Sequence, residues 1–406
     1  MRTLGTLLCL GLVTAGCAAT QDSLPPGNGN KLYEAVSTHS SQVVSVINAR
    51  SHATERRLPL GVPSGDWQHL YSIDGSSLID TDPQTGTTSS TVPLQGHYEL
   101  PAATITGMPG GTSPDGHWLV VESYDRAASS VPTATHFLLI ETTANKVRFT
   151  VNLPGYFHFD AISNDGQRLY LIQYLNGKEY YVRLYNVPAG TLDENIVVDK
   201  SDGNQAMTGL RLSGVASPAG NWLFSMYVRA NDGPFIHALS LDGPFAFCLD
   251  LPGSGYSTSE AEMHWSLAIN RDGSRLYAVN GATGVVAEVD TSNQFSPQVV
   301  RTVQIPGGKS AKAGANAAVL SADGKSLVTA GSSGLIWLDT ASLRVRMQAL
   351  NDWHIWSLGL SPDGRTLFAV SDRGQIAEVS MSSAQVVSRF DPAEGQPLAL
   401  MRVAAS

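Results

Sequence analysis

Ser361-Pro362-Asp363-Gly364, followed by the apolar pair Leu367-Phe368, is one copy of a short pattern that recurs along this 406-residue chain. Each copy is a four-residue turn that ends in glycine, with two large apolar residues shortly after it. The other clear copies are Ser113-Pro114-Asp115-Gly116, Ser163-Asn164-Asp165-Gly166, Ser217-Pro218-Ala219-Gly220, Asn270-Arg271-Asp272-Gly273 and Ser321-Ala322-Asp323-Gly324. A weaker copy, Pro63-Ser64-Gly65-Asp66, stands before Leu70-Tyr71. From Gly65 to Gly364 the marker glycines lie 51, 50, 54, 53, 51 and 40 residues apart, so the chain is built from repeats.

The sequence between these turns predicts four strands in each repeat. In one unit, residues 263–269 predict an innermost strand, 275–279 a second, 285–289 a third and 299–305 an outer one. The turn glycine supplies a positive φ, and Asp or Ser accepts hydrogen bonds from nearby backbone N–H groups, so we assign the marker residues a structural role. Repeats of about 40–50 residues with this layout are typical of propeller blades. We therefore predict an all-β fold, a β-propeller of four-stranded antiparallel blades with almost no helix.

The number of blades depends on how the two ends of the chain are used. Seven marker turns favour seven blades, and eight is the alternative. Residues 32–36 and 42–48 match second and third strands, whereas 397–403 match an innermost strand, so we expect both termini to close the ring within one blade. Only residues 61–64 separate the predicted outer strand at 54–60 from the first marker turn, which argues against an eighth blade.

One repeat carries a resemblance to a known family. Trp265-Ser266-Leu267-Ala268-Ile269-Asn270-Arg271-Asp272-Gly273-Ser274-Arg275-Leu276-Tyr277-Ala278-Val279-Asn280 is similar to the YVTN-type propeller repeats, and Val285-Val286-Ala287-Glu288-Val289-Asp290-Thr291 continues the similarity into the third strand. The resemblance covers most of residues 31–405. It implies the propeller fold and leaves the activity open, because that family includes surface proteins, periplasmic binders and lactonase-like enzymes.

The N-terminus predicts export and attachment to a membrane. Met1-Arg2-Thr3 is a short positive region, and residues 4–13 form an apolar stretch too short to span a bilayer. Thr14-Ala15-Gly16-Cys17 resembles the lipobox of bacterial lipoproteins, although Thr14 stands where that pattern usually has leucine. We expect a signal peptide at 1–16, a flexible tether at 17–30 and a single propeller domain at 31–406. The lipid on Cys17 would hold the protein outside the cytoplasm, on the cell membrane or the outer membrane; an ordinary secretory signal is the alternative.

Charge and cysteine content restrict the partners. The net charge of −9 argues against nucleic acid and against anionic lipid headgroups, so contact with the membrane would come from the lipid alone. Cys9 would leave with the signal peptide and Cys17 would carry the lipid, so Cys248 has no second cysteine in the chain to pair with and we predict no disulfide. We expect a monomer whose partner is an unknown small ligand or an envelope protein.

Several cofactor and catalytic motifs are absent from the sequence. It contains no Cys-x-x-Cys-His for covalent haem, no Gly-x-Ser-x-Gly elbow, no His-Glu-x-x-His and no phosphate-binding glycine-rich loop. The Trp-Asp dipeptide of WD40 repeats and the residue order of the sialidase Asp-box are also missing. We therefore assign no catalytic residue and expect no cofactor, with a divalent metal as the one exception to be tested.

A candidate site comes from the positions of polar and aromatic residues near the start of the predicted innermost strands. These residues are His97, Glu99, Tyr156, His158, Asp160, Arg211, Glu260, Glu262, His264, Asp352, Trp353, His354 and Trp356. Side chains two apart on a strand share a face, so Glu260, Glu262 and His264 are expected to point together. The same holds for Tyr156, His158 and Asp160. Innermost strands line the central channel of a propeller, so these faces are expected to meet there.

From these positions we predict a ligand site at one end of the channel, formed by His158, Glu262, His264, His354 and Trp356. One small ligand would touch at least three of these five residues. His158 and His354 lie at odd offsets from their marker turns and Glu262 and His264 at even ones, so a common face requires a β-bulge. Trp265 and Trp356 share one offset, which fits packing between blades equally well.

Three interpretations of this pattern stay open. The residues are solvated channel groups, or a ligand pocket with walls from Trp265, Trp353 and Trp356, or a divalent-metal site of histidines and carboxylates. We favour an extracytoplasmic, lipid-anchored binding module for a ligand or a protein, without catalysis of its own. The alternative is a metal-assisted, lactonase- or esterase-like hydrolase that uses the central funnel.

Overall fold

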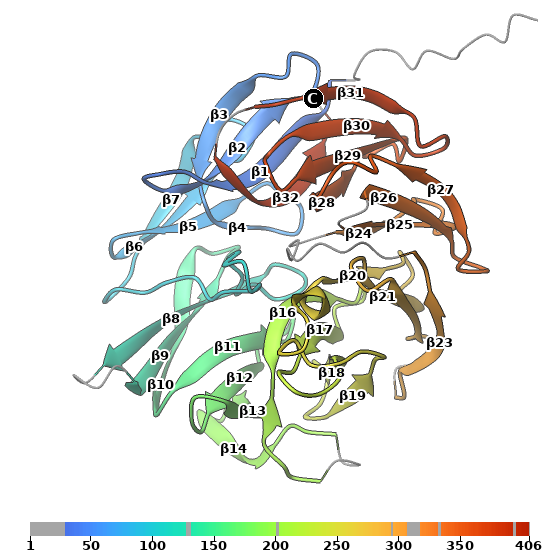
Figure 1. The fold of residues 1–406 in the computed structure, drawn as a ribbon. Helices are drawn as coiled ribbons and strands as arrows, with labels where there is room; N and C mark the ends of the chain where they lie inside the picture. The colour runs from blue at the N-terminus through green and yellow to red at the C-terminus, as the bar shows by residue number, and fades with distance from the viewer. Residues whose placement is uncertain are drawn as a thin grey trace, which may run out of the picture.

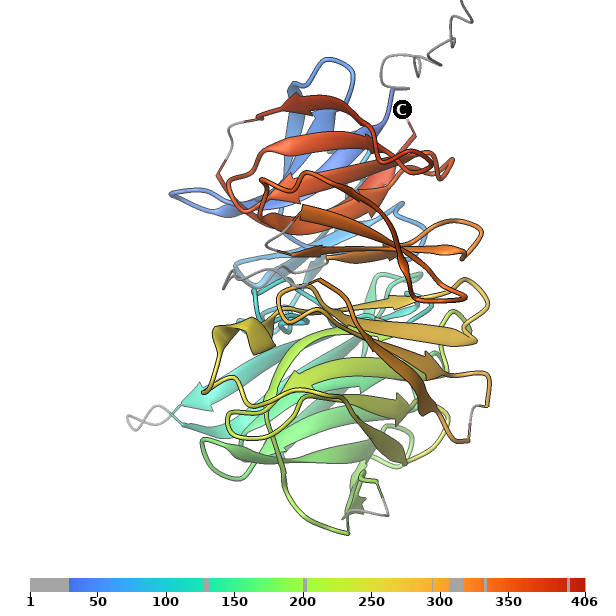
Figure 2. The same cartoon turned by 45° about the vertical axis from the view of Figure 1, so that its right-hand side comes forward.

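The structure is a computed structural model that describes residues 29–126, 131–199, 203–293, 295–306, 317–331, 334–392 and 395–405. The predicted signal peptide and Cys17 lie outside these residues. Strands dominate the described parts, and a short 3-10 turn, η1 (Glu260–Met263), is the one helical element assigned there. Figure 2 shows η1 as a small coil that stands out from one side of the molecule. Among the described residues, no helix is long and apolar enough to cross a membrane.

The strands form eight antiparallel sheets, which we number as blades in chain order (Figure 1). Blade 1 contains β32 (Gln396–Ala404), β1 (Lys31–Ser37), β2 (Gln42–Asn48) and β3 (Thr54–Pro59). Blade 2 contains β4 (Val62–Pro63), β5 (Leu70–Asp74), β6 (Ser77–Thr81) and β7 (Thr88–Pro93). Blade 3 contains β8 (Trp118–Arg126), β9 (Pro132–Glu141) and β10 (Lys146–Pro154). Blade 4 contains β11 (Phe157–Ile162), β12 (Arg168–Tyr174), β13 (Glu179–Asn186), β14 (Thr191–Ile196) and β15 (Met207–Thr208).

The second half of the chain forms four regular blades. Blade 5 contains β16 (Leu210–Ala216), β17 (Trp222–Val228), β18 (Phe235–Ser240) and β19 (Ala246–Asp250). Blade 6 contains β20 (Trp265–Ile269), β21 (Arg275–Asn280), β22 (Val285–Asp290) and β23 (Gln298–Gln304). Blade 7 contains β24 (Ala318–Leu320), β25 (Ser326–Gly331), β26 (Gly334–Asp339) and β27 (Val345–Ala349). Blade 8 contains β28 (Ile355–Leu360), β29 (Thr366–Ser371), β30 (Ile376–Ser380) and β31 (Val386–Phe390).

The preference for seven blades was wrong, because the described residues form eight sheets. The seven marker turns belong to blades 2 to 8, where each precedes the second strand of its blade. Blade 1 has no marker turn because its first strand, β32, and its second, β1, come from opposite ends of the chain and pair through Ala35 and Ala399. The space before the first marker also suffices for a strand, since the two residues of β4 pair with Tyr71 and Leu70.

The marker turns have the predicted chemistry. The Ser361 hydroxyl donates to Asp363 at 2.6 Å and accepts from the backbone N–H of Thr366 at 2.9 Å. Gly364 has a φ of 71°, as the turn requires. In the weaker first copy Ser64 and Asp66 make the same contact at 2.6 Å, but Trp67 rather than Gly65 takes the positive φ, 58°. The position of the marker glycine is therefore taken by Trp67, two residues after Gly65.

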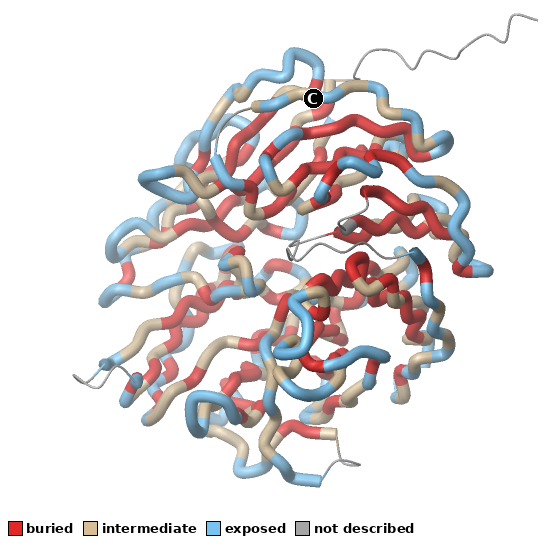
Figure 3. The backbone as a smooth tube through the Cα atoms, in the orientation of Figure 1, coloured by how far each residue is buried: buried red, intermediate tan, exposed pale blue. Residues whose placement is uncertain are grey.

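Apolar clusters join the neighbouring blades, and the buried residues follow the strands (Figure 3). Phe137 of β9 and Leu171 of β12, for example, belong to one cluster between blades 3 and 4. Another cluster contains Leu32 of β1 and Phe368 of β29, and so connects blade 8 with blade 1. Burial of such side chains is the main term that holds blades of a propeller together, at about 25 cal/mol per Å² of apolar surface.

Blade 3 has a hairpin in the place of a regular innermost strand. Isolated bridges pair Glu99 with Glu122 and Thr112 with Leu119, and between them residues 101–110 fold back on themselves. At the tip, the Ile105 N–H donates to the Leu212 carbonyl of β16 at 3.0 Å. On the return arm, Met108 is buried against Ala35 of β1 and Ala399 of β32. This axial hairpin thus extends from blade 3 to blades 1 and 5, and Figure 1 shows it in cyan near the centre of the molecule.

Candidate functional site

His158, on β11, is held by side chains on both sides of its ring. Its Nδ1 lies 2.7 Å from the Tyr124 hydroxyl and 3.0 Å from Glu122 Oε1, and its Nε2 lies 2.7 Å from the Tyr156 hydroxyl. The second Glu122 oxygen accepts from the backbone N–H of Phe159 at 3.0 Å. The Glu122 side chain is buried, with 2% of its surface exposed. The His158 side chain is 33% exposed, so its ring is held by hydrogen-bond partners and still reaches the surface.

Asp160, two residues further along β11, faces a different partner. The β11–β12 register shifts between Phe159 and Ala161, which makes Asp160 a bulge residue. Its carboxylate accepts from Arg211 of β16 at 3.1 Å, and its side chain is 1% exposed. The expectation that Tyr156, His158 and Asp160 point together therefore applies to the first two residues alone, because a bulge breaks the alternation of side chains along the strand.

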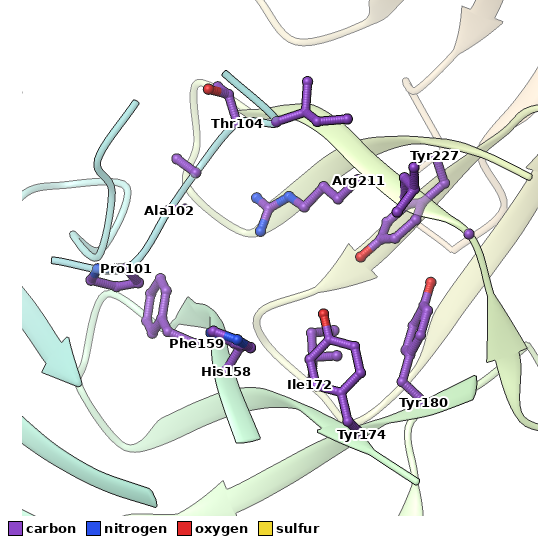
Figure 4. Close-up of a pocket in the computed structure, with 14 residues that line it drawn as sticks. Pro101, Ala102, Thr104, His158, Phe159, Ile172, Tyr174, Tyr180, Arg211 and Tyr227 are labelled. Atoms are coloured by element: carbon purple, nitrogen blue, oxygen red, sulfur yellow. The ribbon is translucent and has the colours of Figure 1, made fainter. Parts of the chain in front are cut away.

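A pocket of about 250 Å³ lies between the axial hairpin and blades 4 and 5. Its walls come from residues 101–105 of the hairpin, from β11 and β12, from the start of β13 and β16, and from the end of β17. The lining residues are Pro101, Ala102, Ala103, Thr104, Ile105, His158, Phe159, Ile172, Tyr174, Tyr180, Gly209, Leu210, Arg211 and Tyr227. Figure 4 shows the Arg211 guanidinium and the Tyr174 and Tyr227 hydroxyls directed toward one common space. We call this space the Tyr–Arg pocket.

The tyrosines of the Tyr–Arg pocket are neutral hydrogen-bond donors. Burial raises the pKa of Tyr174, of Tyr180 and of Tyr227, and the nearby Asp160 carboxylate adds to the rise. Tyr180 and Tyr227 stack with ring centroids 6.1 Å apart, and Tyr174 stacks on Tyr156 at 4.8 Å. These contacts give the pocket aromatic walls whose hydroxyl groups stay protonated at neutral pH.

A second pocket of about 300 Å³ adjoins the first. It shares Phe159, Arg211 and residues 101–103 with the Tyr–Arg pocket, and in addition it is lined by Asp160. Arg211 therefore reaches both spaces, while its carboxylate partner lies on the side of the second pocket. No aspartate or glutamate is among the residues that line the Tyr–Arg pocket.

Glu262 and His264 lie elsewhere, and the strand predicted for residues 263–264 was wrong. Ser259 accepts a hydrogen bond from the Ala261 N–H and begins η1, so the chain is not extended here. Glu262 accepts from the Ser254 backbone N–H at 3.1 Å and from its hydroxyl at 3.0 Å. His264 is buried, and burial lowers its pKa to about 4, which makes it a neutral imidazole.

His354 and Trp356 belong to blade 8. His354 is half exposed, and its Nδ1 lies 3.5 Å from the Asp372 carboxylate. The Trp356 indole donates to the Leu398 carbonyl of β32 at 2.9 Å. Trp265 is 2% exposed in the cluster between blades 5 and 6.

Of the five residues predicted to form one site, His158 is the member that lines the Tyr–Arg pocket. Within the described residues, no hydrogen bond or ion pair joins His158 to Glu262, His264, His354 or Trp356. Their use by a single ligand stays a prediction. In the same part of the chain, no three His, Cys, Asp or Glu side chains are grouped as metal ligands would be.

Comparison with known proteins supports the fold. No protein-family model matches the chain, and no curated protein matches it. Among solved structures, dihydro-heme d1 dehydrogenase NirN in complex with DHE is 14% identical over 92% of this chain and 74% of its own, with a TM-score of 0.55. The chain is a β-propeller. Further similar structures are Kuenenia stuttgartiensis hydrazine synthase (16% identity, 81% of this chain and 99% of that one, TM-score 0.46) and the Pseudomonas aeruginosa periplasmic gluconolactonase PpgL (18%, 91% and 97%, 0.46). At such low identity the likeness is one of fold alone.

Proposed function

We propose that this propeller binds a small ligand in the Tyr–Arg pocket and has no catalytic activity of its own. The observation that carries the proposal is the convergence of one guanidinium and two phenol hydroxyls in a concave, mostly apolar space. Small-molecule sites have this composition, with apolar walls and a few polar groups that fix the orientation of the ligand.

The polar groups of the pocket are held in place before any ligand arrives. Arg211 is fixed by Asp160, and His158 by Glu122, Tyr124 and Tyr156. Groups that are already ordered lose little conformational freedom on binding, which favours affinity. The axial hairpin is tied to β16 and packs through Met108, so the remaining wall is also supported.

A hydrolase that uses the central funnel is the second candidate, and one observation favours it. Glu122, His158 and Tyr156 form a carboxylate–imidazole–hydroxyl series, the arrangement that activates a nucleophile in many hydrolases. Burial raises the pKa of Tyr156, however, so forming the phenolate there is costly. For this reason binding is the function that we favour.

We also propose that the protein is an exported lipoprotein anchored through Cys17, and that the pairing of β1 with β32 closes the ring of blades. The lipobox-like Thr14-Ala15-Gly16-Cys17 supports the first statement, and the cluster shared by blades 8 and 1 supports the second. Metabolic labelling with a palmitate analogue tests the anchor. Labelling should disappear in Cys17→Ala, and labelling that persists in this variant excludes the anchor.

The binding function is tested by filling the pocket. Ala102 is exposed on the axial hairpin and lines the pocket, so Ala102→Trp should occupy part of the space and reduce ligand binding at least tenfold. Ala53→Trp, in the exposed turn between β2 and β3, is the matched control and should bind normally. Saturation-transfer NMR with a fragment library measures the effect. Absence of any bound fragment, or equal binding by both variants, contradicts the proposal.

A further inference from the structure

We propose that the ligand of the Tyr–Arg pocket is a small organic carboxylate, whose charged end contacts Arg211 and whose hydrocarbon body lies against the aromatic walls. This inference rests on the proposed binding function and adds the chemical class of the ligand.

The first argument is charge. Arg211 is the one residue with a permanent charge in the pocket lining, and no carboxylate lines the pocket, although the chain as a whole carries a net charge of −9. Asp160 balances the charge of Arg211 from the side of the second pocket. The two side chains share one hydrogen bond, which Nη1 of Arg211 donates to Oδ1 of Asp160. A guanidinium has five N–H donors, so most of its donors are free for another acceptor.

The second argument is the match between donors and acceptors. Arg211, Tyr174 and Tyr227 all present N–H or O–H donors to the same space, and a carboxylate is a group that only accepts. The planar guanidinium binds a carboxylate through two parallel hydrogen bonds, which are among the stronger ones in proteins. A cationic ligand would meet Arg211 without any compensating acid in the lining.

The position of the guanidinium depends on a glycine. A Cβ atom on Gly214 of β16 would lie 2.9 Å from Arg211 Nη2 and 3.2 Å from the Ser225 hydroxyl. Gly214 lines the second pocket, and its lack of a side chain leaves room for the guanidinium there. Any larger residue at this position would displace the charged group.

The third argument concerns the body of the ligand. Phe159 and Ile172 form apolar walls, and at the mouth Ile105 and Leu210 remain 44% and 41% exposed. A bound hydrocarbon group would cover these two side chains and remove apolar surface from water. Inorganic anions offer no such surface, so the walls favour an organic acid. The volume of about 250 Å³ restricts it to a compact molecule.

Calorimetric titration with matched pairs of compounds tests the inference. The probes are benzoate, cyclohexanecarboxylate and hexanoate, each beside its neutral amide, together with inorganic phosphate. We expect at least one carboxylate to bind about tenfold or more tightly than its amide and than phosphate, the ratio typical of a charge-assisted hydrogen bond. Tyr227→Phe should weaken the binding of that carboxylate about threefold or more and should have a smaller effect on the binding of its amide.

Two variants separate loss of charge from loss of fold. Arg211→Gln alone leaves Asp160 buried without its partner, so the double variant Asp160→Asn/Arg211→Gln removes both charges together. This variant should lose the preference for carboxylate over amide while its thermal unfolding stays cooperative. Gly214→Ala should reduce the same preference by displacing the guanidinium.

The outcomes distinguish this inference from the function on which it rests. Equal binding of acids and amides, or a preference that survives in the double variant, overturns the carboxylate assignment. If neutral fragments bind and Ala102→Trp blocks them, the pocket is still a binding site. Phosphate binding as tight as the best carboxylate also overturns the assignment, because it would show an anion site without recognition of the hydrocarbon body. Failure of every probe and every fragment to bind contradicts both proposals.

Discussion

Single residues in this propeller take roles that their local sequence does not specify. His158 and His264 both precede a marker turn by a few residues, yet one is held by Glu122 at a pocket edge and the other is buried and neutral. Glu122 belongs to β8 of the neighbouring blade 3, whereas His264 is the C-terminal cap residue of η1.

Because His264 is buried, we expect the stability of the fold to depend on pH. Its pKa in the fold is about 4, below the ordinary 6.5, so the unfolded chain binds its proton more readily than the folded one. The contribution to stability is complete above about pH 6.5 and is lost as the pH falls toward 4, by up to about 3 kcal/mol. Urea denaturation between pH 7.5 and 4.5 should show this loss.

The variant His264→Leu should reduce that pH dependence. It should not abolish it, since burial also lowers the pKa of His237. His39→Gln, at an exposed position, is the control and should leave the dependence unchanged. An unaltered pH profile in His264→Leu would show that His264 does not titrate as its burial requires.

At the scale of elements, the axial hairpin is the feature that creates the pocket. Its base depends on Gly111, which has a φ of 113°. A Cβ atom there would lie 2.5 Å from the Val120 carbonyl and 3.1 Å from Pro101. The close approach of the hairpin base to β8 therefore requires glycine at this position.

A pair of glycine variants tests this dependence. Gly75→Ala, at a φ of 58° with no atom within 4 Å of the new Cβ, should cost only the backbone penalty of about 1–2 kcal/mol. Gly111→Ala should lower the free energy of unfolding further, with a loss that exceeds that of Gly75→Ala by more than about 2 kcal/mol. It should also weaken binding in the Tyr–Arg pocket. Urea denaturation of both variants gives the comparison. Equal losses would mean that the hairpin base adapts and is not fixed by the glycine.

The elements also show why part of the structure could be predicted. The Ser-x-Asp-Gly turns are local, since Ser361, Asp363 and Gly364 bond to one another and to the nearby Thr366, so their sequence is enough to place them. The axial hairpin is not local. It is held by a contact between Ile105 and Leu212, which are far apart in the chain, and no repeat signal marks it.

The pocket residues were predicted in part for the same reason. His158, Asp160 and Arg211 lie on innermost strands and belong to the polar pattern found in the sequence. Tyr174, Tyr180 and Tyr227 lie at the ends of β12 and β17 and at the start of β13, where the pattern was not sought. The sequence does carry one signal for these residues, the group Tyr174, Tyr180 and Tyr181 around one short turn. Tyrosine hydroxyls that become buried need polar partners, so such a group indicates a polar site nearby.

At the scale of the whole molecule, the repeat predicted the type of fold but not the number of blades. Marker turns occur only where the first and second strands of a blade are joined by the chain. The blade that combines β32 with β1 lacks that connection, so counting the turns gives one blade too few. The count from the repeats and the count from the sheets agree once this blade is added.

The central claim is that the Tyr–Arg pocket is the ligand site of the molecule. NMR of the protein with ¹³C-labelled tyrosine rings, titrated with the tightest-binding fragment or carboxylate, tests it most directly. The account predicts that the largest shifts occur in the ring signals of Tyr174 and Tyr227, assigned by substitution with phenylalanine, while Tyr33 in blade 1 and Tyr277 in blade 6 stay unchanged. Largest shifts at Tyr33 or Tyr277, or saturable binding that leaves Tyr174 and Tyr227 unperturbed, would contradict it.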